Sequence, residues 1–487
     1  DGSITVRMHS IGGWGAITTG KNLAMTLYDM LGFNIKANPK YGSEKKGQPT
    51  TFYLSAAPEP IKVNCEYFYV DVVLSPDPNV LNHTNALAGL KEGGVFIIQS
   101  DLGDADKVWE SIPIAFQQII VEKNIRVFYL DAFRIARDEA TDADLQLRMQ
   151  GVAFQGAFFA ASPVLQQKGL DEGELLKAIR SQLEYKFGDK GARVVEDNMR
   201  VVKRGFDEVH EITDKPFTLK NGGTSAVPPE PAVPVMVKRQ PQSKAPATDI
   251  HRFWEQTGNF YARGMGNDNL TDPFIGLGVM PAVTSLFRDM TGIRFEHPEW
   301  NAENCTACGD CYTICPDTAI PGLVNEVGQV LDTVVKRVRK SGKATEHLPR
   351  AVRKMERHLR AEMNAGAETD PVSGMIATAI DKTVAEADEA SRAALASEFE
   401  DFSEELDGFQ FALSRPYYTL PEKKQAGEGG LLSITIDPYT CKGCMECVKV
   451  CEDDALKPVT QTPESTDQLR QHWDFWLDLP NTPKKYI

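Results

Sequence analysis

The chain has 487 residues, of which 42% are hydrophobic and 25% are charged, so it is long enough to fold into roughly two to four domains with substantial cores. Its formal net charge of −15 argues against general nucleic-acid binding. No uninterrupted apolar run reaches the roughly 18 residues that a membrane-spanning helix requires, and no basic and apolar leader opens the chain, so we expect neither a membrane span nor secretion.

Residues 1–213 alternate between strand-like and helix-like stretches. Strands are expected at 4–10, 50–55, 67–74, 95–100 and 126–131. Helices are expected after the first strand up to residue 31 and at 142–161, 171–187 and 191–212. Strands that are separated by helices predict an α/β domain with a mainly parallel sheet.

A glycine-rich turn at residues 12–15 follows the first expected strand. It matches the dinucleotide fingerprint G-x-G-x-x-G imperfectly, because the later glycine is out of register. It also matches a phosphate loop imperfectly, because Asn22 follows Lys21 where a hydroxyl would bind magnesium. A tight turn that starts a helix, with an anion at the helix N-terminus as one option, explains the stretch better.

Residues 41–49 form a polar segment between two expected strands and carry two adjacent lysines between glycines. One interpretation is an exposed hairpin. The other is a loop that meets a phosphate-bearing ligand or a partner subunit. Composition does not decide between these two interpretations.

Prolines and glycines break the pattern between residues 214 and 250 and predict an extended linker. Residues 251–300 regain aromatic residues and short apolar runs. We expect this second segment to be a small connecting unit that packs against the domain that comes after it.

Eight of the nine cysteines fall into two runs with the same spacing, C-x-x-C-x-x-C-x-x-x-C. In two-cluster modules with this spacing, three thiolates of one loop bind a [4Fe-4S] cluster and the fourth binds the other cluster. The predicted ligands of the first cluster are Cys305, Cys308, Cys311 and Cys451. The predicted ligands of the second cluster are Cys441, Cys444, Cys447 and Cys315.

Structural zinc and disulfide bonds are the competing interpretations of these cysteines. Zinc ribbons usually give paired C-x-x-C knuckles, without a third cysteine at the same step. Cysteines three residues apart in a tight turn make poor disulfide bridges. Iron–sulfur ligation therefore fits the spacing best, and thiolates that are kept for clusters indicate a reducing cytoplasm.

Charged residues flank the second run. Residues 452–454 are all carboxylates, and the first of them occupies the position where a proline is usual. They either face a cluster, where they favour its oxidised state and lower its potential, or face water. Lys442, Lys449 and Lys457 surround the same run, so an acidic carrier is expected to prefer this face.

A long segment, 323–427, separates the two cysteine runs, and its apolar residues recur at helical spacing. Cations dominate residues 336–360 and anions dominate residues 386–407. In one interpretation the helices complement each other's charge. In the other they form a docking surface for an electron carrier or a sister subunit.

The cysteine-bearing parts, 301–322 and 428–460, together predict an α+β, bacterial-type two-[4Fe-4S] ferredoxin-like domain that carries this helical insert. The tail, 461–487, holds Trp473 and two further aromatic residues close to it. We expect the tail to clamp onto this domain or a neighbouring one.

Several short motifs occur in an order that is typical of a known family. They are Gly12-Gly13-Trp14-Gly15-Ala16, Tyr41-Gly42-Ser43-Glu44-Lys45-Lys46-Gly47, Glu59-Pro60-Ile61, Asp77-Pro78, His297-Pro298-Glu299-Trp300 and Trp473-Asp474-Phe475. In this order the chain resembles the gamma domain of 2-oxoacid:ferredoxin oxidoreductases, and its last two motifs resemble regions of pyruvate:ferredoxin oxidoreductase. Ser10 departs from that family, which commonly has the first glycine of the turn at this position.

The resemblance implies oxidative decarboxylation of a 2-oxoacid on thiamine diphosphate and magnesium, acyl transfer to coenzyme A, and electron transfer to ferredoxin or flavodoxin. A G-D-G with a later asparagine, which the thiamine site should carry, is not found in the sequence. The resemblance therefore assigns no catalytic residue to this chain. It places the thiamine and 2-oxoacid sites on partner chains, or on another part of a longer polypeptide, in a higher oligomer. It also implies that Ser43, Lys45 and Lys46 contact coenzyme A or a subunit.

Two other functions are compatible with the sequence. The chain is then either an iron–sulfur electron-transfer module of another reductase, without 2-oxoacid chemistry, or a structural subunit whose clusters only stabilise the fold. Thiamine-binding partners would support the 2-oxoacid function over both, and reversible reduction of both clusters would exclude a purely structural role.

Overall fold

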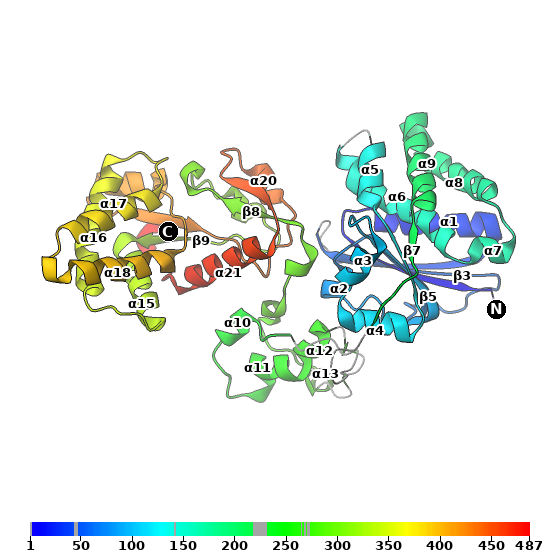
Figure 1. Cartoon of the computed structure of the whole chain (residues 1–487), viewed down its shortest axis with the longest axis horizontal. Helices are drawn as coiled ribbons and strands as arrows, with labels where there is room; N and C mark the ends of the chain where they lie inside the picture. Colours follow the sequence, from blue (N-terminus) through cyan, green and yellow to red (C-terminus); the bar gives the residue numbers. More distant parts are fainter. Residues whose placement is uncertain are drawn as a thin grey trace. The chain divides into compact units, whose positions relative to one another are not determined.

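The computed structural model describes residues 2–42, 47–140, 143–217, 231–263, 265–266, 269 and 273–487. The chain divides into two compact units, Asp1–Arg288 and Asp289–Ile487, and Figure 1 traces both. Within the described ranges, no helix combines the length and apolar character that a membrane crossing requires.

A seven-stranded sheet with the order β2-β3-β1-β4-β5-β6-β7 forms the centre of the first unit. Its strands are β1 (Ile4–Ile11), β2 (Asn34–Lys40), β3 (Pro49–Ala57), β4 (Val70–Ser75), β5 (Leu90–Gln99), β6 (Arg126–Leu130) and β7 (His210–Ile212). The four central strands β1, β4, β5 and β6 are parallel, whereas the pairings of β2, β3 and β7 are antiparallel. The predicted α/β domain is confirmed, and its sheet is parallel at the centre and antiparallel at both edges.

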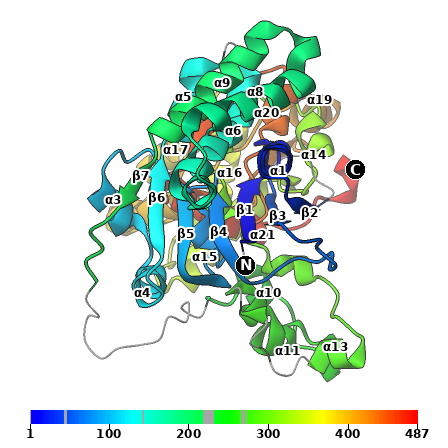
Figure 2. The same ribbon diagram turned by 90° about the vertical axis from the view of Figure 1, so that its right-hand side faces the viewer.

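Helices cover both faces of this sheet. They are α1 (Ala16–Leu31), α2 (Val80–His83), α3 (Ala105–Ser111), α4 (Ile114–Glu122), α5 (Ala132–Glu139), α6 (Ala143–Ala161), α7 (Val164–Lys168), α8 (Glu172–Phe187) and α9 (Ala192–Asp207). Val72 and Leu74 of β4 lie in one core with α1, α6, α8 and α9, whereas Val73 lies in the other with α2, α3 and α4. Successive side chains of the strand therefore point into two separate cores, one on each face of the sheet. Figure 2 shows α5, α6, α8 and α9 gathered on one side of the sheet.

The glycine turn after β1 leads directly into a helix. Gly13 and Gly15 have φ values of 96° and 83°, a left-handed conformation that glycine adopts without a Cβ penalty. Gly20 lies inside α1, where an added Cβ would come within 2.4 Å of the Phe52 ring. The phosphate-loop reading is therefore wrong, because the residues that would form the loop are helical.

Two expectations for this unit need correction. The stretch 191–212 was expected to be one helix, but α9 ends at Asp207 and His210–Ile212 forms β7. Pairing with β6 places β7 at the edge of the sheet and overrides the helical pattern there. Strand β2 was not expected, because its side chains are only partly buried and show no apolar alternation.

Short helices begin within the predicted linker, of which residues 218–230 lie outside the described part. They are α10 (Val235–Lys238), α11 (Ile250–Phe253), α12 (Asn259–Ala262) and α13 (Pro273–Leu277). The rings of Phe253 and Phe274 meet edge to face at 4.8 Å, and the Phe287 ring stacks on Phe253 at 5.6 Å. These residues belong to the first unit, and the finer division into a linker and a connecting unit stays a prediction.

The second unit contains two halves with the same order of elements. One half is β8 (Glu296–Trp300), the first cysteine run with α14 (Asp310–Ile314), and β9 (Gly322–Glu326). The other is β10 (Gly430–Ile434), the second run with α20 (Glu446–Val450), and β11 (Leu456–Thr460). Strand β8 pairs with β11 and β9 with β10, both antiparallel, so each two-stranded sheet takes one strand from each half. Helices α14 and α20 pack against each other, which brings the two cysteine runs together.

The segment between β9 and β10 is helical, as its apolar spacing predicts. Its helices are α15 (Val327–Lys340), α16 (Leu348–Ala365), α17 (Val372–Ala385), α18 (Glu389–Leu406) and α19 (Leu420–Lys424). Phe475 of the tail helix α21 (Pro463–Asp478) lies in their core and is 2% exposed. Trp473 and Trp476 of α21 stack at 5.3 Å, so the tail packs onto this unit through its aromatic residues.

Candidate iron–sulfur centres

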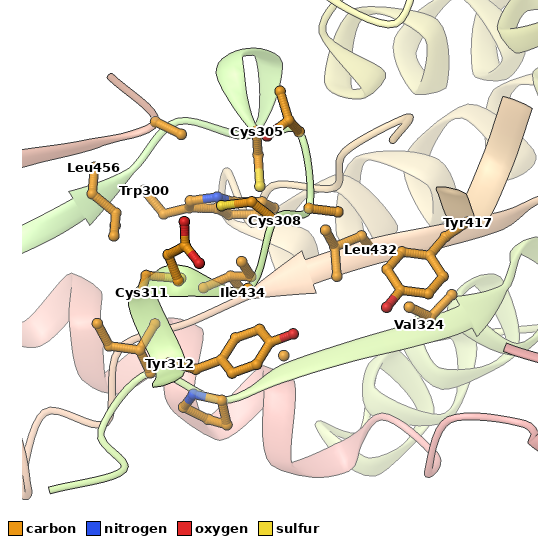
Figure 3. Close-up of a pocket in the computed structure, with 18 of the residues that line it drawn as sticks. Trp300, Cys305, Cys308, Cys311, Tyr312, Val324, Tyr417, Leu432, Ile434 and Leu456 are labelled. Carbon is orange, nitrogen blue, oxygen red and sulfur yellow. The ribbon is translucent and has the colours of Figure 1, made fainter. Parts of the chain in front are cut away.

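The first predicted set of ligands lines one cavity. Cys305, Cys308 and Cys311 of the first run share a cavity of about 580 Å³ with Cys451 of the second run. Figure 3 shows Cys305, Cys308 and Cys311 around this cavity, with the rings of Trp300 and Tyr312 beside them. The structure therefore brings together thiols from both runs at a single place.

The thiols of each predicted set also influence one another electrostatically. Burial raises the pKa of the Cys311 thiol to about 11, and its neighbours Cys305, Cys308 and Cys451 act in the same direction. Burial raises the pKa of the Cys447 thiol to about 12, and there the neighbours are Cys441, Cys444 and Cys315. Each group of four thus contains three cysteines of one run and the last cysteine of the other.

The second group is more deeply buried than the first. Cys441 and Cys447 are 7% and 6% exposed, whereas Cys305 and Cys311 are half-buried and Cys308 is exposed. The backbone N–H of Ala319 donates to the Cys315 sulfur at 3.3 Å. Cys315 is therefore held in place by the turn at the end of its own run.

The two ligand loops have the same unusual backbone. Ala307 and Gly309 have φ values of 65° and 86°, and the equivalent Gly443 and Met445 have values of 68° and 57°. The left-handed turns direct the Ala307 N–H to the Cys305 sulfur and the Gly443 N–H to the Cys441 sulfur, which lowers the pKa of both thiols against the effect of burial. The left-handed conformation costs a non-glycine residue about 1 kcal/mol of backbone strain. Ala307 and Met445 are therefore strained at the turns that position the thiols.

Two polar side chains border the first group. The indole N–H of Trp300 is buried and has no hydrogen-bond partner among the described residues, and its proximity to Cys305 lowers the pKa of that thiol. Asp453 lines the cavity, and its carboxylate accepts a hydrogen bond from the Thr306 hydroxyl at 2.6 Å. Of the three carboxylates at residues 452–454, Asp453 is the one that lines this cavity.

Buried charges border the second group. Lys442 comes directly after Cys441, and its ammonium lies 3.1 Å from the Asp317 carboxylate, with the two side chains 2% and 3% exposed. The expectation that Lys442 forms part of a docking face is therefore wrong, because the cation is buried in an ion pair. Lys449, which is 63% exposed, remains at the surface.

Sequence reasoning missed Arg294. Its guanidinium is buried, with 2% exposure, and donates to the backbone carbonyl of Cys441 at 2.8 Å. No spacing rule connects an arginine before β8 with a cysteine of the second run. The one signal in the sequence was its position a few residues ahead of the motif that precedes Cys305.

The candidate residues of the first unit, Ser43, Lys45 and Lys46, lie outside the described residues. The residues that follow them are placed, because Gly12 donates to the Gln48 carbonyl at 2.7 Å and Gly47 donates to the Gly12 carbonyl at 3.1 Å. Gly47 and Gln48 therefore lie beside the glycine turn.

Many of the segregated cations and anions of the insert pair with each other within the second unit. Lys343 pairs with Asp401 at 2.9 Å and with Glu404 at 2.6 Å. Arg337 pairs with Glu405 at 3.1 Å, and Lys354 pairs with Glu386 at 2.7 Å. These contacts support the interpretation in which the helices complement each other, and a docking role stays a prediction.

The residues present fit iron–sulfur ligation. All nine cysteines are free thiols, and eight of them belong to the two runs. Sulfur ligands with backbone N–H donors beside them, in a cavity with apolar walls such as Leu432 and Ile434, are typical of [4Fe-4S] sites. At least one 4Fe-4S binding motif is therefore present in this chain.

The sequence matches the family described as "Pyruvate ferredoxin/flavodoxin oxidoreductase" over residues 5–208 and the one described as "4Fe-4S binding domain" over residues 297–320. Pyruvate-flavodoxin oxidoreductase of Klebsiella pneumoniae is 26% identical over 328 residues, which cover 67% of this chain and 25% of that protein. Pyruvate:ferredoxin oxidoreductase of Moorella thermoacetica is 24% identical over 319 residues, which cover 66% of this chain and 25% of that protein. Among solved structures, the pyruvate oxidoreductase subunit PORC of Thermotoga maritima aligns with a TM-score of 0.33 and 22% identity, covering 43% of this chain and 98% of that one.

This chain spans about a quarter of the length of these two curated relatives. The first match covers most of the sheet domain, and the second covers the first cysteine run. The chain therefore joins a domain that matches the pyruvate ferredoxin/flavodoxin oxidoreductase family model to a segment that matches the model of a 4Fe-4S binding domain.

Proposed function

We propose that this chain is the gamma and electron-transfer part of a thiamine-dependent, coenzyme A-acylating 2-oxoacid:ferredoxin oxidoreductase. The observation that carries the proposal is the combination of the two parts in one chain. A domain that matches the oxidoreductase family model is followed by two cysteine runs with the spacing of [4Fe-4S] ligands, and thiols of both runs line one cavity. A single-cluster site would need only one such run.

We assign one [4Fe-4S] cluster to Cys305, Cys308, Cys311 and Cys451 and the second to Cys441, Cys444, Cys447 and Cys315. When bound, such clusters take up and release single electrons, which suits the connection of a two-electron oxidation to one-electron acceptors. The chain's own contribution is to position the thiols. The left-handed turns direct backbone N–H groups at the sulfurs, and apolar side chains limit the access of water.

Burial raises the pKa of four of the thiols, so the folded chain without metal holds protons on these four sulfurs at neutral pH; they are Cys305, Cys311, Cys441 and Cys447. Iron binding requires thiolates, so loading releases protons to solvent. The N–H donors at Ala307 and Gly443 reduce that cost because they stabilise the negative charge on Cys305 and Cys441.

The thiamine and 2-oxoacid sites are proposed to lie on partner chains or on another part of a longer polypeptide, because the chain spans about a quarter of its curated relatives. Those relatives are named for pyruvate and for ferredoxin or flavodoxin, so pyruvate is the first substrate to test and these carriers are the first acceptors. The loop with Ser43, Lys45 and Lys46 is proposed to contact coenzyme A or a neighbouring subunit. The proposed assembly is cytoplasmic and oligomeric.

The test is to isolate the intact assembly without oxygen, identify every polypeptide and count iron. Two clusters in this chain require about eight irons per copy beyond those of its partners. The assembly is expected to reduce a dye when pyruvate is supplied, and to do so faster with coenzyme A. Iron at a single-cluster level, zinc in place of iron, or persistent absence of a thiamine-binding partner would contradict the proposal.

A further inference from the structure

Two side-chain contacts link the two cysteine runs. They join equivalent positions of the runs, but one is a hydrogen bond from a hydroxyl and the other is an ion pair. Thr306 and Lys442 each come directly after the first cysteine of their run. Asp453 and Asp317 each lie two residues after the last cysteine of the opposite run. Thr306 donates to Asp453 at 2.6 Å, and Lys442 pairs with Asp317 at 3.1 Å. Equivalent positions in the two halves therefore make equivalent contacts, but only one of them neutralises its carboxylate.

The charge balance next to the two groups differs as a result. A hydroxyl leaves the charge of Asp453 in place beside the cavity that Cys305, Cys308 and Cys311 line. At the second group the ammonium of Lys442 offsets the charge of Asp317, and both side chains are excluded from water. Charges in a poorly hydrated interior act more strongly than charges at the surface.

Arg294 adds a positive charge to the second group. Its guanidinium donates to the carbonyl oxygens of Pro438 at 2.5 Å and of Cys441 at 2.8 Å. Its remaining hydrogen bonds go to Gln461 and Thr291, so among the described residues no carboxylate lies at ion-pair distance from it. The carboxylates of Asp289 and Asp437 act on its charge from beyond ion-pair distance, and that of Asp437 accepts from the N–H groups of Tyr439 and Thr440.

A buried cation without an ion partner is costly, because the loss of hydration amounts to several kcal/mol. An anionic cluster at Cys441 would provide the missing negative charge. Arg294 is therefore best explained as the counter-cation of the second group, held against the backbone of its first ligand.

We propose that Arg294 and the Lys442–Asp317 pair give the cluster on Cys441, Cys444, Cys447 and Cys315 a more positive midpoint potential than the cluster on the first group, where Asp453 keeps its charge. A positive charge stabilises the reduced, more negative state of a cluster, and a negative charge destabilises it. The proposal rests on the two-cluster assignment made above. It predicts a fixed order of potentials within the chain, set by residues that do not bind iron.

The experiment is an anaerobic redox titration of the loaded protein, followed by electron paramagnetic resonance, with iron and sulfide counted for every variant. Arg294→Gln is expected to shift the more positive midpoint downward and to leave the other nearly unchanged. Lys449→Gln removes the same charge from an exposed position within the second run and is expected to shift neither midpoint, since water and salt screen it.

Two variants at the exposed first pair test the proposal without disturbing a buried residue. Asp453→Asn removes the carboxylate charge, and Thr306→Lys adds a cation that can pair with it. Both are expected to shift the more negative midpoint upward, so the two potentials approach each other. These variants carry the test if Arg294→Gln fails to retain iron.

The proposal is overturned if Arg294→Gln moves the more negative midpoint, or if both midpoints ignore all three charge changes while iron remains at about eight per chain. Equal midpoints in the unaltered protein would also overturn it. A chain that binds only one cluster would instead contradict the proposed function, so the two failures are distinguishable.

Discussion

The carboxylate of Glu398 on α18 accepts a hydrogen bond from the backbone N–H of Leu348, the first residue of α16, at 2.6 Å. The N–H groups of Glu346 and His347 donate to the same carboxylate. Glu398 is 4% exposed, so a buried anion from one helix supplies the N-terminal acceptor that α16 lacks in its own sequence.

Replacement of Glu398 should loosen the start of α16. Glu398→Ala leaves three backbone N–H groups without their acceptor and is expected to cost about 2–4 kcal/mol of local stability. Glu398→Gln keeps an acceptor and is expected to cost less. Hydrogen exchange at residues 346–352 measures the change. The control is Glu404→Ala, at a side chain that is 71% exposed, and protection equal to that of the control would contradict the expectation.

Spectroscopy can test directly whether each cluster takes its fourth ligand from the opposite run. Cys451→Ser should alter the same electron paramagnetic resonance signal as Cys308→Ser, and Cys315→Ser the same signal as Cys444→Ser. The exposed ninth cysteine gives the control, because Cys65→Ser should retain all iron. If Cys451→Ser instead alters the Cys444→Ser signal, each run binds its own cluster and the assignment is wrong.

The substitution Trp300→Phe should distinguish the electrostatic effect of the indole N–H from the packing effect of the aromatic ring. Phenylalanine retains an aromatic ring in the cavity wall but removes the buried N–H that lowers the pKa of Cys305. Loss of an N–H donor to a ligand sulfur makes reduction less favourable, so the midpoint of the first group is expected to fall. Redox titration checks the shift. An unchanged midpoint with full iron content would show that the indole N–H has no electrostatic role.

His9 on β1 should make the first unit sensitive to acid. Burial, together with Arg7 and His83, lowers the pKa of this imidazole from 6.5 to about 3. Below about pH 6.5 the unfolded chain therefore binds a proton at His9, whereas the folded chain does not. The free energy of unfolding falls by up to about 1.4 kcal/mol per pH unit as the pH is lowered from 6.5 to 3.

Unfolding by urea, followed at pH 7 and pH 5, measures this loss. His9→Gln is expected to reduce the difference between the two pH values. His210→Gln, at an exposed histidine on β7, is the control and should leave the difference unchanged. Equal pH dependence in both variants would assign the acid sensitivity to other groups.

The sequence pattern predicted the central strands, which are apolar runs buried on both faces, and the long helices, whose apolar residues recur at helical spacing. It failed at the edges of the first sheet. Strand β2 has mostly half-buried side chains, and the three-residue β7 exists because β6 offers an edge to pair with. Neither cause leaves a periodic signal in the local sequence.

Spacing alone predicted which thiols gather, because the ligand loops are local structures. It could not predict what surrounds them. Lys442 was expected at the surface because most lysines are exposed. Its burial depends on Asp317, which the fold brings in from the opposite run. Arg294 was missed for the same reason, since its partners Pro438 and Cys441 are distant in sequence.

The residues that flank the helical insert are direct partners in the sheet, with Glu326 opposite Gly430. A chain that turned straight from β9 into β10 would therefore keep the same ladder, so the whole block is, in topological terms, an enlarged hairpin loop. Such a block can be gained or lost during evolution without rethreading the strands beside the thiols. Loss of the block would also change the tail, because the Phe475 ring, which packs in the core of the block, would become exposed to water.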